Sequence, residues 1–411
     1  MSLDTDETPT GGAGAGPEGT RSRPAADRTG LWAAAGGLRG VAVAIGILVA
    51  TRVGQLAMLA WLDANDDQPT GVRSRLLVWD GGWFLRVAMD GYPTGYDYDP
   101  SGAVAGNGLA FFPLYPMLIR GVAALGVDPG TAALAVSWLA SLAAAVALYL
   151  LGTTLHSRRA GWALVALCFA QPMSVVLSMA YSESLFLALV AGMLVAAHRR
   201  VWWAAGLLGL GAALTRPTGL AAALALAAAA ALVILEGRRS GTGFSGIWRP
   251  MLAAAVALAG VPAFLGWVAW RVGDLDAWFT IQTAGWGTSF DYGRSTWRFL
   301  DETLGGGDGW VPISVALILL VALAAAVVAL LERPWLPLAV YGVIAMVLVY
   351  GQAGYYHSKP RLLLPVLLTL LPAAVAAARA RPRVAVPALV GFALFGLWYG
   401  AHMVAVWPYT I

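Results

Sequence analysis

The sequence predicts an all-α protein that crosses a membrane many times, and its composition carries that prediction. Of the 411 residues, 59% are hydrophobic and only 12% are charged. A soluble domain carries about 25% charged residues, so this chain is too poor in charge to be one. Apolar runs approaching the length of about 20 residues that crosses a bilayer recur along most of the chain. The fold class is therefore a polytopic helical membrane protein.

We expect about eleven membrane-crossing helices in one domain that covers residues 38–411. The candidate spans are the apolar runs near 38–62, 130–151, 160–181, 183–198, 202–216, 218–236, 250–271, 312–332, 335–353, 361–378 and 384–405. Pro217 separates two of the shorter runs. It is expected to be the first residue of the second helix of that pair, where its missing N–H costs nothing.

The first 37 residues are expected to form a disordered cytoplasmic tail. They are rich in Gly, Pro, Thr, Asp and Arg and nearly free of large apolar residues. Such a segment cannot bury enough apolar surface to become ordered. It does not read as a signal peptide, because the first apolar run begins only near Leu38.

Basic residues predict the orientation of the chain in the plasma membrane. With a cytoplasmic N-terminus, five basic loops also fall inside, at 156–159, 198–200, 236–249, 332–333 and 379–383. This arrangement requires that residues 111–126 do not cross. We therefore expect an outer loop at 63–129 that carries interfacial or re-entrant segments, and a second outer loop at 272–311. The net charge is only +4 and sits mostly at helix ends, which argues against a nucleic-acid partner.

The unusual polar motifs all fall on the opposite, extracytoplasmic face under this orientation. They are Trp79–Trp83, Tyr181–Ser184, Thr215–Thr218 and His357–Arg361. Three cations among them, Arg216, Lys359 and Arg361, run against the positive-inside pattern. Their presence on the outer face predicts an anionic partner there.

Asp80 has two interpretations that the local sequence leaves open. As a helix N-cap, its carboxylate would accept a hydrogen bond from the first turn of a helix that runs to about Asp90. This helix would be amphipathic and interfacial, with Trp79 and Trp83 as aromatic anchors. As a general base, Asp80 would face a cavity. A residue at a helix start can do both.

The polar residues near the other motifs are also open to two interpretations. Glu183 could complement the dipole of a helix start, or it could orient a substrate hydroxyl with help from Tyr181. Arg216 could complement the C-terminal dipole of a helix or contact lipid headgroups, or it could hold a phosphate through bidentate hydrogen bonds. Trp79, Trp83, Tyr181 and Glu183 are the candidate substrate-binding residues.

The segment His357–Arg361 contains the only lysine of the chain, Lys359, directly before an apolar run. It could be a snorkelling anchor, but the anchors elsewhere are arginines. We interpret His357, Lys359 and Arg361, with Arg216, as a clamp for phosphate. Arg52 lies within the first predicted span, where a charge is costly and marks a functional candidate.

The sequence predicts neither a metal site nor a bound cofactor. The four histidines are dispersed and show no metal-ligand spacing with Asp, Glu or Cys. No glycine-rich phosphate loop and no Gly-x-Ser-x-Gly turn is present. The single cysteine, Cys168, excludes an intrachain disulfide.

Five of these stretches together resemble the bacterial branch of the PIG-V family of mannosyltransferases. The first two are Trp79-Asp80-Gly-Gly-Trp-Phe with Asp90-Gly-Tyr, and Phe112-Pro-Leu-Tyr-Pro. The others are Ala180-Tyr-Ser-Glu-Ser-Leu-Phe186, Leu214-Thr-Arg-Pro-Thr-Gly219 and Ser358-Lys-Pro-Arg361. The motifs are short, but they follow the family order across most of the chain.

The resemblance implies a helical bundle of the GT-C type, with Asp80 at the position of the catalytic base. It also implies that polyprenyl-phosphate-mannose is the donor, and it leaves the acceptor open among glycolipids, glycans and proteins. A transporter or flippase of a lipid-linked sugar is the alternative, and it predicts inverted repeats and charges buried in mid-membrane helices. A non-catalytic membrane scaffold is a third possibility.

Overall fold

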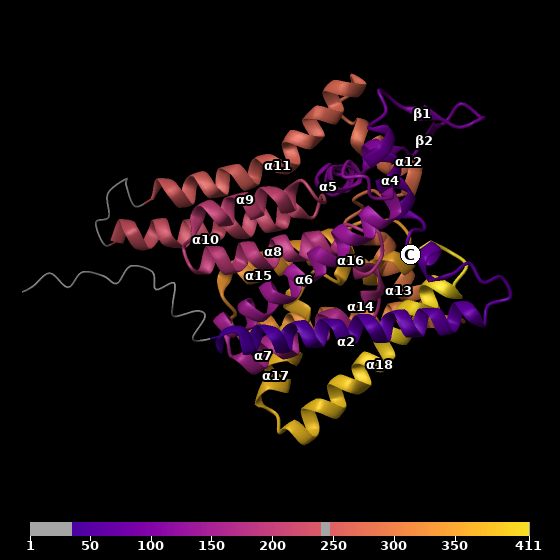
Figure 1. The fold of residues 1–411 in the computed structure, drawn as a ribbon. Helices are drawn as coiled ribbons and strands as arrows, with labels where there is room; N and C mark the ends of the chain where they lie inside the picture. The colour runs from indigo at the N-terminus through magenta and orange to yellow at the C-terminus, as the bar shows by residue number, and fades with distance from the viewer. Residues whose placement is uncertain (1–34, 240–246, 411) are drawn as a thin grey trace, which may run out of the picture.

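A computed structural model gives the fold of residues 35–239 and 247–410 (Figure 1). The predicted tail falls almost wholly outside the described residues, as does part of the basic loop at 236–249. The α-helices are α2 (Gly37–Ala64), α3 (Val72–Arg75), α4 (Asp80–Asp90), α5 (Leu114–Ala123), α6 (Pro129–Leu155), α7 (Arg158–Ala170), α8 (Glu183–His198), α9 (Trp202–Ala213), α10 (Gly219–Arg239), α11 (Trp248–Val272), α12 (Ala277–Trp286), α13 (Arg294–Gly306), α14 (Trp310–Leu331), α15 (Leu336–Gly351), α16 (Lys359–Leu363), α17 (Leu371–Arg379) and α18 (Pro382–Ala405). The short 3₁₀ helices are η1 (Gly108–Ala110), η2 (Ser174–Leu177), η4 (Tyr356–Ser358) and η5 (Leu367–Thr369).

Long apolar helices dominate the described chain and confirm a helical membrane protein. Six of them are long and apolar enough to cross a bilayer, and they match expected spans: α2, α6, α10, α11, α14 and α18. α8, α9 and α15 also match expected runs but have only 16, 12 and 16 residues. The expected count of about eleven spans is therefore not confirmed, since six helices, or seven with one bent pair, meet the length criterion within the described residues.

Two of the expected spans are broken, and a proline marks each break. The bent pair of helices turns by 81° between Leu363 and Leu367, around Pro365. α7 ends at Ala170, and Gln171 before Pro172 is extended (φ −65°, ψ 159°). A residue that precedes proline is pushed out of the helical region, which accounts for the end of α7. Leu364, before Pro365, keeps helical angles (φ −53°, ψ −45°), so the bend of the other pair falls after it. Pro172 was the signal in the sequence for the second break.

The segment at the second break, residues 171–182, is buried almost throughout and depends on side chains from other helices. Arg52 of α2 donates hydrogen bonds to the carbonyls of Phe169 and Ser174 and to the Ser178 hydroxyl. Side chains of α6 supply more: Ser137 donates to Tyr181 O, Trp138 to Ser178 O and Ser141 to Leu177 O. Arg52 thus satisfies backbone groups that a broken helix leaves without partners.

Pro217 is not the first residue of a helix, contrary to expectation. α9 ends at Ala213 and α10 begins at Gly219, so Pro217 lies in the turn between them. Gly219 packs closely against the end of α9, since a Cβ atom there would lie 2.4 Å from Ala213 Cα. The turn carries Arg216 toward α8, where it meets Glu183.

A set of short elements gathers at one end of the bundle, at the right in Figure 1. It contains α4, α5, α12, α13 and a two-stranded antiparallel sheet of β1 (Asp97–Tyr98) and β2 (Val104–Ala105). α5 has ten residues, or about 15 Å of helix, which is half the thickness of a hydrocarbon core. The assignment of α4 and α5 to an outer loop remains a prediction.

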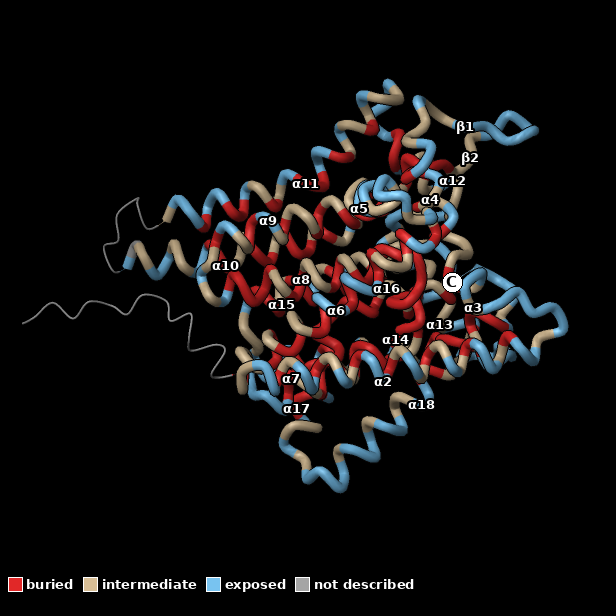
Figure 2. Tube along the Cα trace, in the orientation of Figure 1, coloured by how far each residue is buried: buried red, intermediate tan, exposed pale blue. Residues whose placement is uncertain are grey.

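The core lies where α6, α7 and α8 pack with the buried segment 171–182 (Figure 2). α8 is buried on most of its surface, whereas α14 and α18 show large exposed apolar faces, as lipid-facing helices do. The first turn of α8, which contains Glu183, is buried in this core. The polar motifs meet at this turn.

Candidate active site

Asp80 begins α4 but does not cap it. The residue at the N-cap position is Trp79, and no side chain caps the helix. Asp80 Oδ2 instead accepts a hydrogen bond of 2.7 Å from Arg361 Nη1. The interpretation of Asp80 as a bare N-cap is therefore wrong, because Asp80 is the first residue of the helix and its carboxylate pairs with Arg361 of α16.

The backbone just before Asp80 is strained. Trp79 has φ 57° and ψ −116°, a conformation that glycine adopts readily and a tryptophan rarely. Such outliers cost about 1–3 kcal/mol and gather at functional sites. A hydrogen bond of 2.9 Å from the Ala180 N–H to Leu76 O holds this turn against the buried segment 171–182.

Four charged side chains form an alternating chain of ion pairs. Arg361 pairs with Asp80 at 2.7 Å, and its Nε lies 3.6 Å from Glu183 Oε1. The same Glu183 oxygen lies 2.6 Å from Arg216 Nη1. The order is Asp80, Arg361, Glu183, Arg216, so each carboxylate is next to a guanidinium.

Burial distinguishes the two carboxylates. The side chain of Glu183 is 1% exposed, whereas that of Asp80 is 20% exposed and lines a cavity. A buried carboxylate needs partners to compensate for lost hydration, and Arg216 and Arg361 are those partners. Asp80 is thus the accessible acid of the site, and Glu183 holds the two arginines in place.

Tyr181 and Ser182 complete the support of the arginines. The Arg361 guanidinium carbon lies 5.1 Å from the centre of the fully buried Tyr181 ring. Arg216 Nη1 donates a hydrogen bond of 3.2 Å to Ser182 Oγ. The motif Tyr181–Ser184 therefore acts as the floor of the site, and Tyr181 lies beneath Arg361 rather than at the open surface.

Lys359 joins this cluster, but His357 does not. Lys359 lines the cavity, and its Nζ donates to Val349 O at 2.9 Å and to Gln352 O at 2.7 Å, at the C-terminal end of α15. His357 is buried among aromatic rings, with Tyr355 and Tyr409 stacked on it. The structure thus places three of the four proposed phosphate ligands around one cavity and puts the fourth in an aromatic cluster.

The predicted aromatic residues lie beside the cavity rather than on its wall. Trp83 stacks on Phe111 at 6.0 Å and meets the edge of Trp286 at 5.7 Å. Its other contact is with Arg86, whose guanidinium carbon is 4.6 Å from the ring. Trp83 therefore supports Phe111 and Trp286, which do line the cavity. Trp79 packs against the main core.

The cavity has a volume of about 390 Å³ and joins a charged region to an apolar one. The charged region holds Asp80, Arg216, Lys359 and Arg361, together with Ser182, Thr215, Thr218 and Ser358. The apolar region is formed by Leu220, Val261, Leu265 and Phe279 of α10, α11 and α12. Phe279 is 54% exposed on the molecular surface, so the apolar region extends to the outside of the bundle.

Residues of the second predicted loop line the cavity too, and sequence reasoning did not single them out. They are Trp278, Gln282, Trp286, Thr288, Ser289 and Phe290. They reach the site because α12 is fixed to the first loop: Gln282 Nε2 donates to Ala110 O at 3.0 Å. A Cβ on Gly285 would lie 2.7 Å from Gly106 Cα, so the two backbones touch. The repeated aromatic and amide residues after Asp276 were the available signal.

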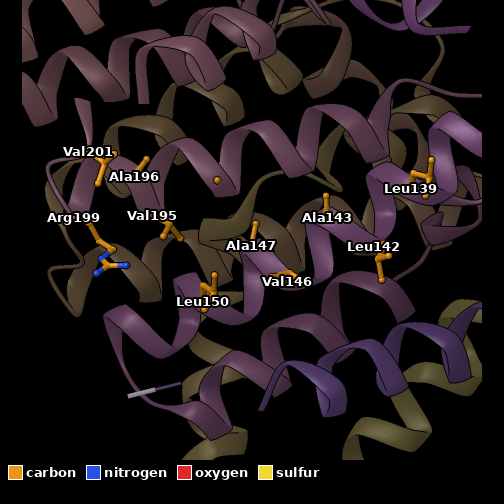
Figure 3. A pocket seen from close by; sticks show the side chains of 11 residues that line it. Leu139, Leu142, Ala143, Val146, Ala147, Leu150, Val195, Ala196, Arg199 and Val201 are labelled. Carbon is orange, nitrogen blue, oxygen red and sulfur yellow. The ribbon is translucent and has the colours of Figure 1, made fainter. Parts of the chain in front are cut away.

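A larger and mostly apolar cavity of about 630 Å³ lies away from these residues (Figure 3). Its walls come from α6 and α8, and Arg199 lies at one end of it. Arg199 is the one charged residue among those that line this cavity. The smaller cavity is therefore the candidate active site.

The described residues contain no cluster of three or more His, Cys, Asp or Glu side chains that could hold a metal ion. The site itself contains two carboxylates, Asp80 and Glu183, and each is already paired with a guanidinium group. The arrangement therefore suits an anionic ligand next to a proton acceptor.

Comparison with known proteins gives a distant structural likeness. No protein-family model matches the chain. No curated protein matches it either. Among solved structures, it is similar to the oligosaccharyltransferase of Archaeoglobus fulgidus in a complex with Zn and sulfate, with 12% identity and a TM-score of 0.44 over 87% of this chain and 52% of that one. The same values of identity and TM-score apply to the archaeal oligosaccharyltransferase AglB from Archaeoglobus fulgidus with an inhibitory peptide and a dolichol-phosphate, over 88% of this chain and 55% of that one. The chain thus spans about half the length of these proteins, and a likeness of this degree carries no information on its activity.

Proposed function

We propose that this protein is an inverting membrane glycosyltransferase of the GT-C kind, which moves mannose from polyprenyl-phosphate-mannose to a glycolipid, glycan or protein acceptor. The observation that carries the proposal is a single cavity that combines an accessible carboxylate, Asp80, with three cations, Arg216, Lys359 and Arg361. The same cavity opens through apolar walls to the surface of the bundle.

The carboxylate supplies the base that glycosyl transfer needs. Asp80 takes the proton of an acceptor hydroxyl while that oxygen bonds to the anomeric carbon of the donor. The bond from this carbon to the phosphate oxygen breaks at the same time, and the polyprenyl phosphate leaves with the electron pair. General-base help of this kind is worth about 10²–10⁴-fold in rate. One displacement inverts the anomeric centre and converts a β-linked donor into an α-mannoside.

The cations supply the stabilisation that the leaving group needs. Negative charge grows on the phosphate as the bond to the sugar breaks, and donors that are already in place stabilise it without reorganisation. Arg216 and Arg361 present planar guanidinium groups, and Lys359 presents an ammonium group. Glu183 is a positioning residue in this scheme, because it holds both guanidiniums and lies below the cavity surface.

The apolar region suits the lipid part of such a donor. A polyprenyl chain stays in the membrane while its phosphate reaches headgroup depth, so its site must open sideways between helices. The walls formed by Leu220, Val261, Leu265 and Phe279 provide this opening. The orientation predicted from basic loops places the reaction on the extracytoplasmic face of the plasma membrane, where activated nucleotide sugars are absent and a lipid-carried donor is required.

Acceptor binding is assigned to the part of the cavity between α12 and the end of α15. Trp286, Ser289, Phe290 and Gln352 line this part. Flat aromatic faces beside hydroxyl and amide groups match the alternation of C–H and O–H groups on a sugar ring. This part of the cavity accommodates a hydroxylated acceptor close to Asp80.

A flippase of lipid-linked sugars is the competing function. Arg52 is a partly buried charge in the middle of a long span, as this function would use, yet its guanidinium is engaged with the carbonyls of Phe169 and Ser174. The charges that line the cavity, Asp80, Arg216, Lys359 and Arg361, come instead from the short helices α4 and α16 and from the turn before α10. This distribution favours chemistry at a membrane face over transport through the membrane.

The test is transfer by purified protein, with radiolabelled polyprenyl-phosphate-mannose, candidate acceptors of the three classes, and mass spectrometry of the products. Asp80→Asn is expected to lower transfer by at least about a hundredfold. Asp90→Asn, which changes an exposed carboxylate on the same helix, is expected to leave it unchanged. Full activity of Asp80→Asn would refute the base assignment. Movement of the labelled lipid across liposomes without any sugar transfer would establish the flippase.

A further inference from the structure

Asp80 is already engaged in the structure, and this conflicts with its role as a base. Its Oδ2 accepts a hydrogen bond of 2.7 Å from Arg361, and both side chains are largely buried, at 20% and 12% exposure. This hydrogen bond occupies Oδ2, one of the two carboxylate oxygens that could accept the proton of an acceptor hydroxyl. The pair must therefore separate before Oδ2 can take that proton.

Arg361 has a second partner that lets it separate from Asp80 without becoming an isolated buried charge. Its Nε lies 3.6 Å from Glu183 Oε1, and Tyr181 packs beneath its guanidinium. Within the described residues, Arg361 Nε has no hydrogen-bond partner, so its contact with Glu183 is an ion pair without a hydrogen bond. The guanidinium therefore keeps a charge partner and an aromatic support when its Nη1 atom changes its ligand.

We infer that the donor phosphate takes Arg361 from Asp80, and that this exchange of partners is what releases the base. The inference rests on the function proposed above. The phosphodiester of the donor carries one negative charge, as the carboxylate does, and it enters a cavity that Arg361 lines together with Arg216 and Lys359. A phosphate placed among these three cations competes directly with the carboxylate for Arg361.

The exchange couples donor binding to the release of the base and imposes an order on the reaction. Before the donor binds, Arg361 holds Oδ2 of Asp80. After the donor binds, Asp80 is free and faces the acceptor side of the cavity. Coupling between two ligands of one group is reciprocal: if the donor weakens the pair, then loss of the pair strengthens donor binding.

A double-mutant cycle on donor affinity tests the exchange. Titration calorimetry in detergent, with a short-chain prenyl-phosphate-mannose and no acceptor, gives the dissociation constant. Asp80→Asn should bind this donor about fivefold or more tightly, the lower end of typical coupling effects. In the Arg361→Gln background, the same change at Asp80 should have no effect, because the competition is gone. Asp90→Asn is the matched control, with unchanged affinity.

Simple charge repulsion predicts a different result. If Asp80 only repels the phosphate, its neutralisation tightens donor binding by the same factor in the wild-type and the Arg361→Gln backgrounds, and the coupling in the cycle is zero. A zero coupling, or an unchanged affinity of Asp80→Asn, would overturn the exchange. A gain in affinity is a readout that misfolding cannot produce.

An infrared measurement tests the same step without any change at Arg361. Addition of the short-chain donor to the wild-type protein should shift the carboxylate stretching band of Asp80, and the band should be missing from the difference spectrum of Asp80→Asn. A donor-induced spectrum that is identical in the two proteins would rule the exchange out. These failures are separate from failure of the proposed function, which would show as full transfer by Asp80→Asn.

Discussion

Asp80 and Arg361 are separated by 281 positions in the chain, and a hydrogen bond of 2.7 Å joins their side chains. The contact links the first turn of α4 to α16, two short helices that come from the two halves of the chain. Glu183 and Arg216 extend it from α8 and from the turn before α10. The chemistry of the site is thus distributed over four segments that only the complete fold brings together.

Glu183 is predicted to stabilise the fold as well as the site. Glu183→Gln removes the buried charge that Arg216 and Arg361 share, and breaking a buried pair typically costs about 3–5 kcal/mol. We expect a loss of roughly 3 kcal/mol in the free energy of unfolding, measured by chemical denaturation in detergent. Glu302→Gln, at an exposed position of α13, is the control and should have no measurable effect. Equal stability of the two variants would contradict the structural role of Glu183.

Two glycines in helices predict opposite effects of the same substitution. Gly285→Ala in α12 would place a Cβ 2.7 Å from Gly106 Cα, and overpacking of this kind costs about 1–3 kcal/mol. Gly305→Ala in α13 meets nothing within 4 Å and gains helix propensity, by up to about 1 kcal/mol. Thermal unfolding should therefore show a lower melting temperature for Gly285→Ala and an equal or higher one for Gly305→Ala. Similar melting temperatures would show that α12 is not tightly fixed to the first loop.

Arg52 is predicted to act on stability rather than on donor binding. Arg52→Met removes the hydrogen bonds to the carbonyls of Phe169 and Ser174, and a buried unpaired polar group costs about 1–3 kcal/mol. We expect roughly 3 kcal/mol of destabilisation with an unchanged donor dissociation constant. Arg39→Met, at an exposed position of the same helix, should leave both quantities unchanged. A weaker donor affinity of Arg52→Met at full stability would assign Arg52 to the site.

Local patterns in the sequence predicted the long helices well, because a run of about 20 apolar residues has few alternatives to crossing a membrane. α2 and α18 match their expected ranges closely. The same reasoning missed the break in α7, since it gave more weight to hydropathy than to Pro172. It also expected Pro217 to begin a helix, whereas α10 begins two residues later, at Gly219.

The sequence predicted which residues belong to the site, but it did not predict which of them contact each other. Charge on an apolar background marked Asp80, Glu183, Arg216, Lys359 and Arg361, and the structure brings all five together. The pattern could not show that Glu183 lies beneath the arginines, because burial depends on the depth at which α8 begins. It could not separate His357 from Lys359 two positions later, although a turn of 3₁₀ helix directs them to different surroundings.

The break after α7 also makes the site depend on residues that do not line it. Residues 171–182 leave carbonyl groups that Arg52 of α2 and Ser141 of α6 satisfy, and an unpaired carbonyl in hydrocarbon costs several kcal/mol. The backbone of this segment is therefore stable in a bilayer only when α2 and α6 are packed beside it. A substitution that removes one of these donors acts on the floor of the site from outside the cavity.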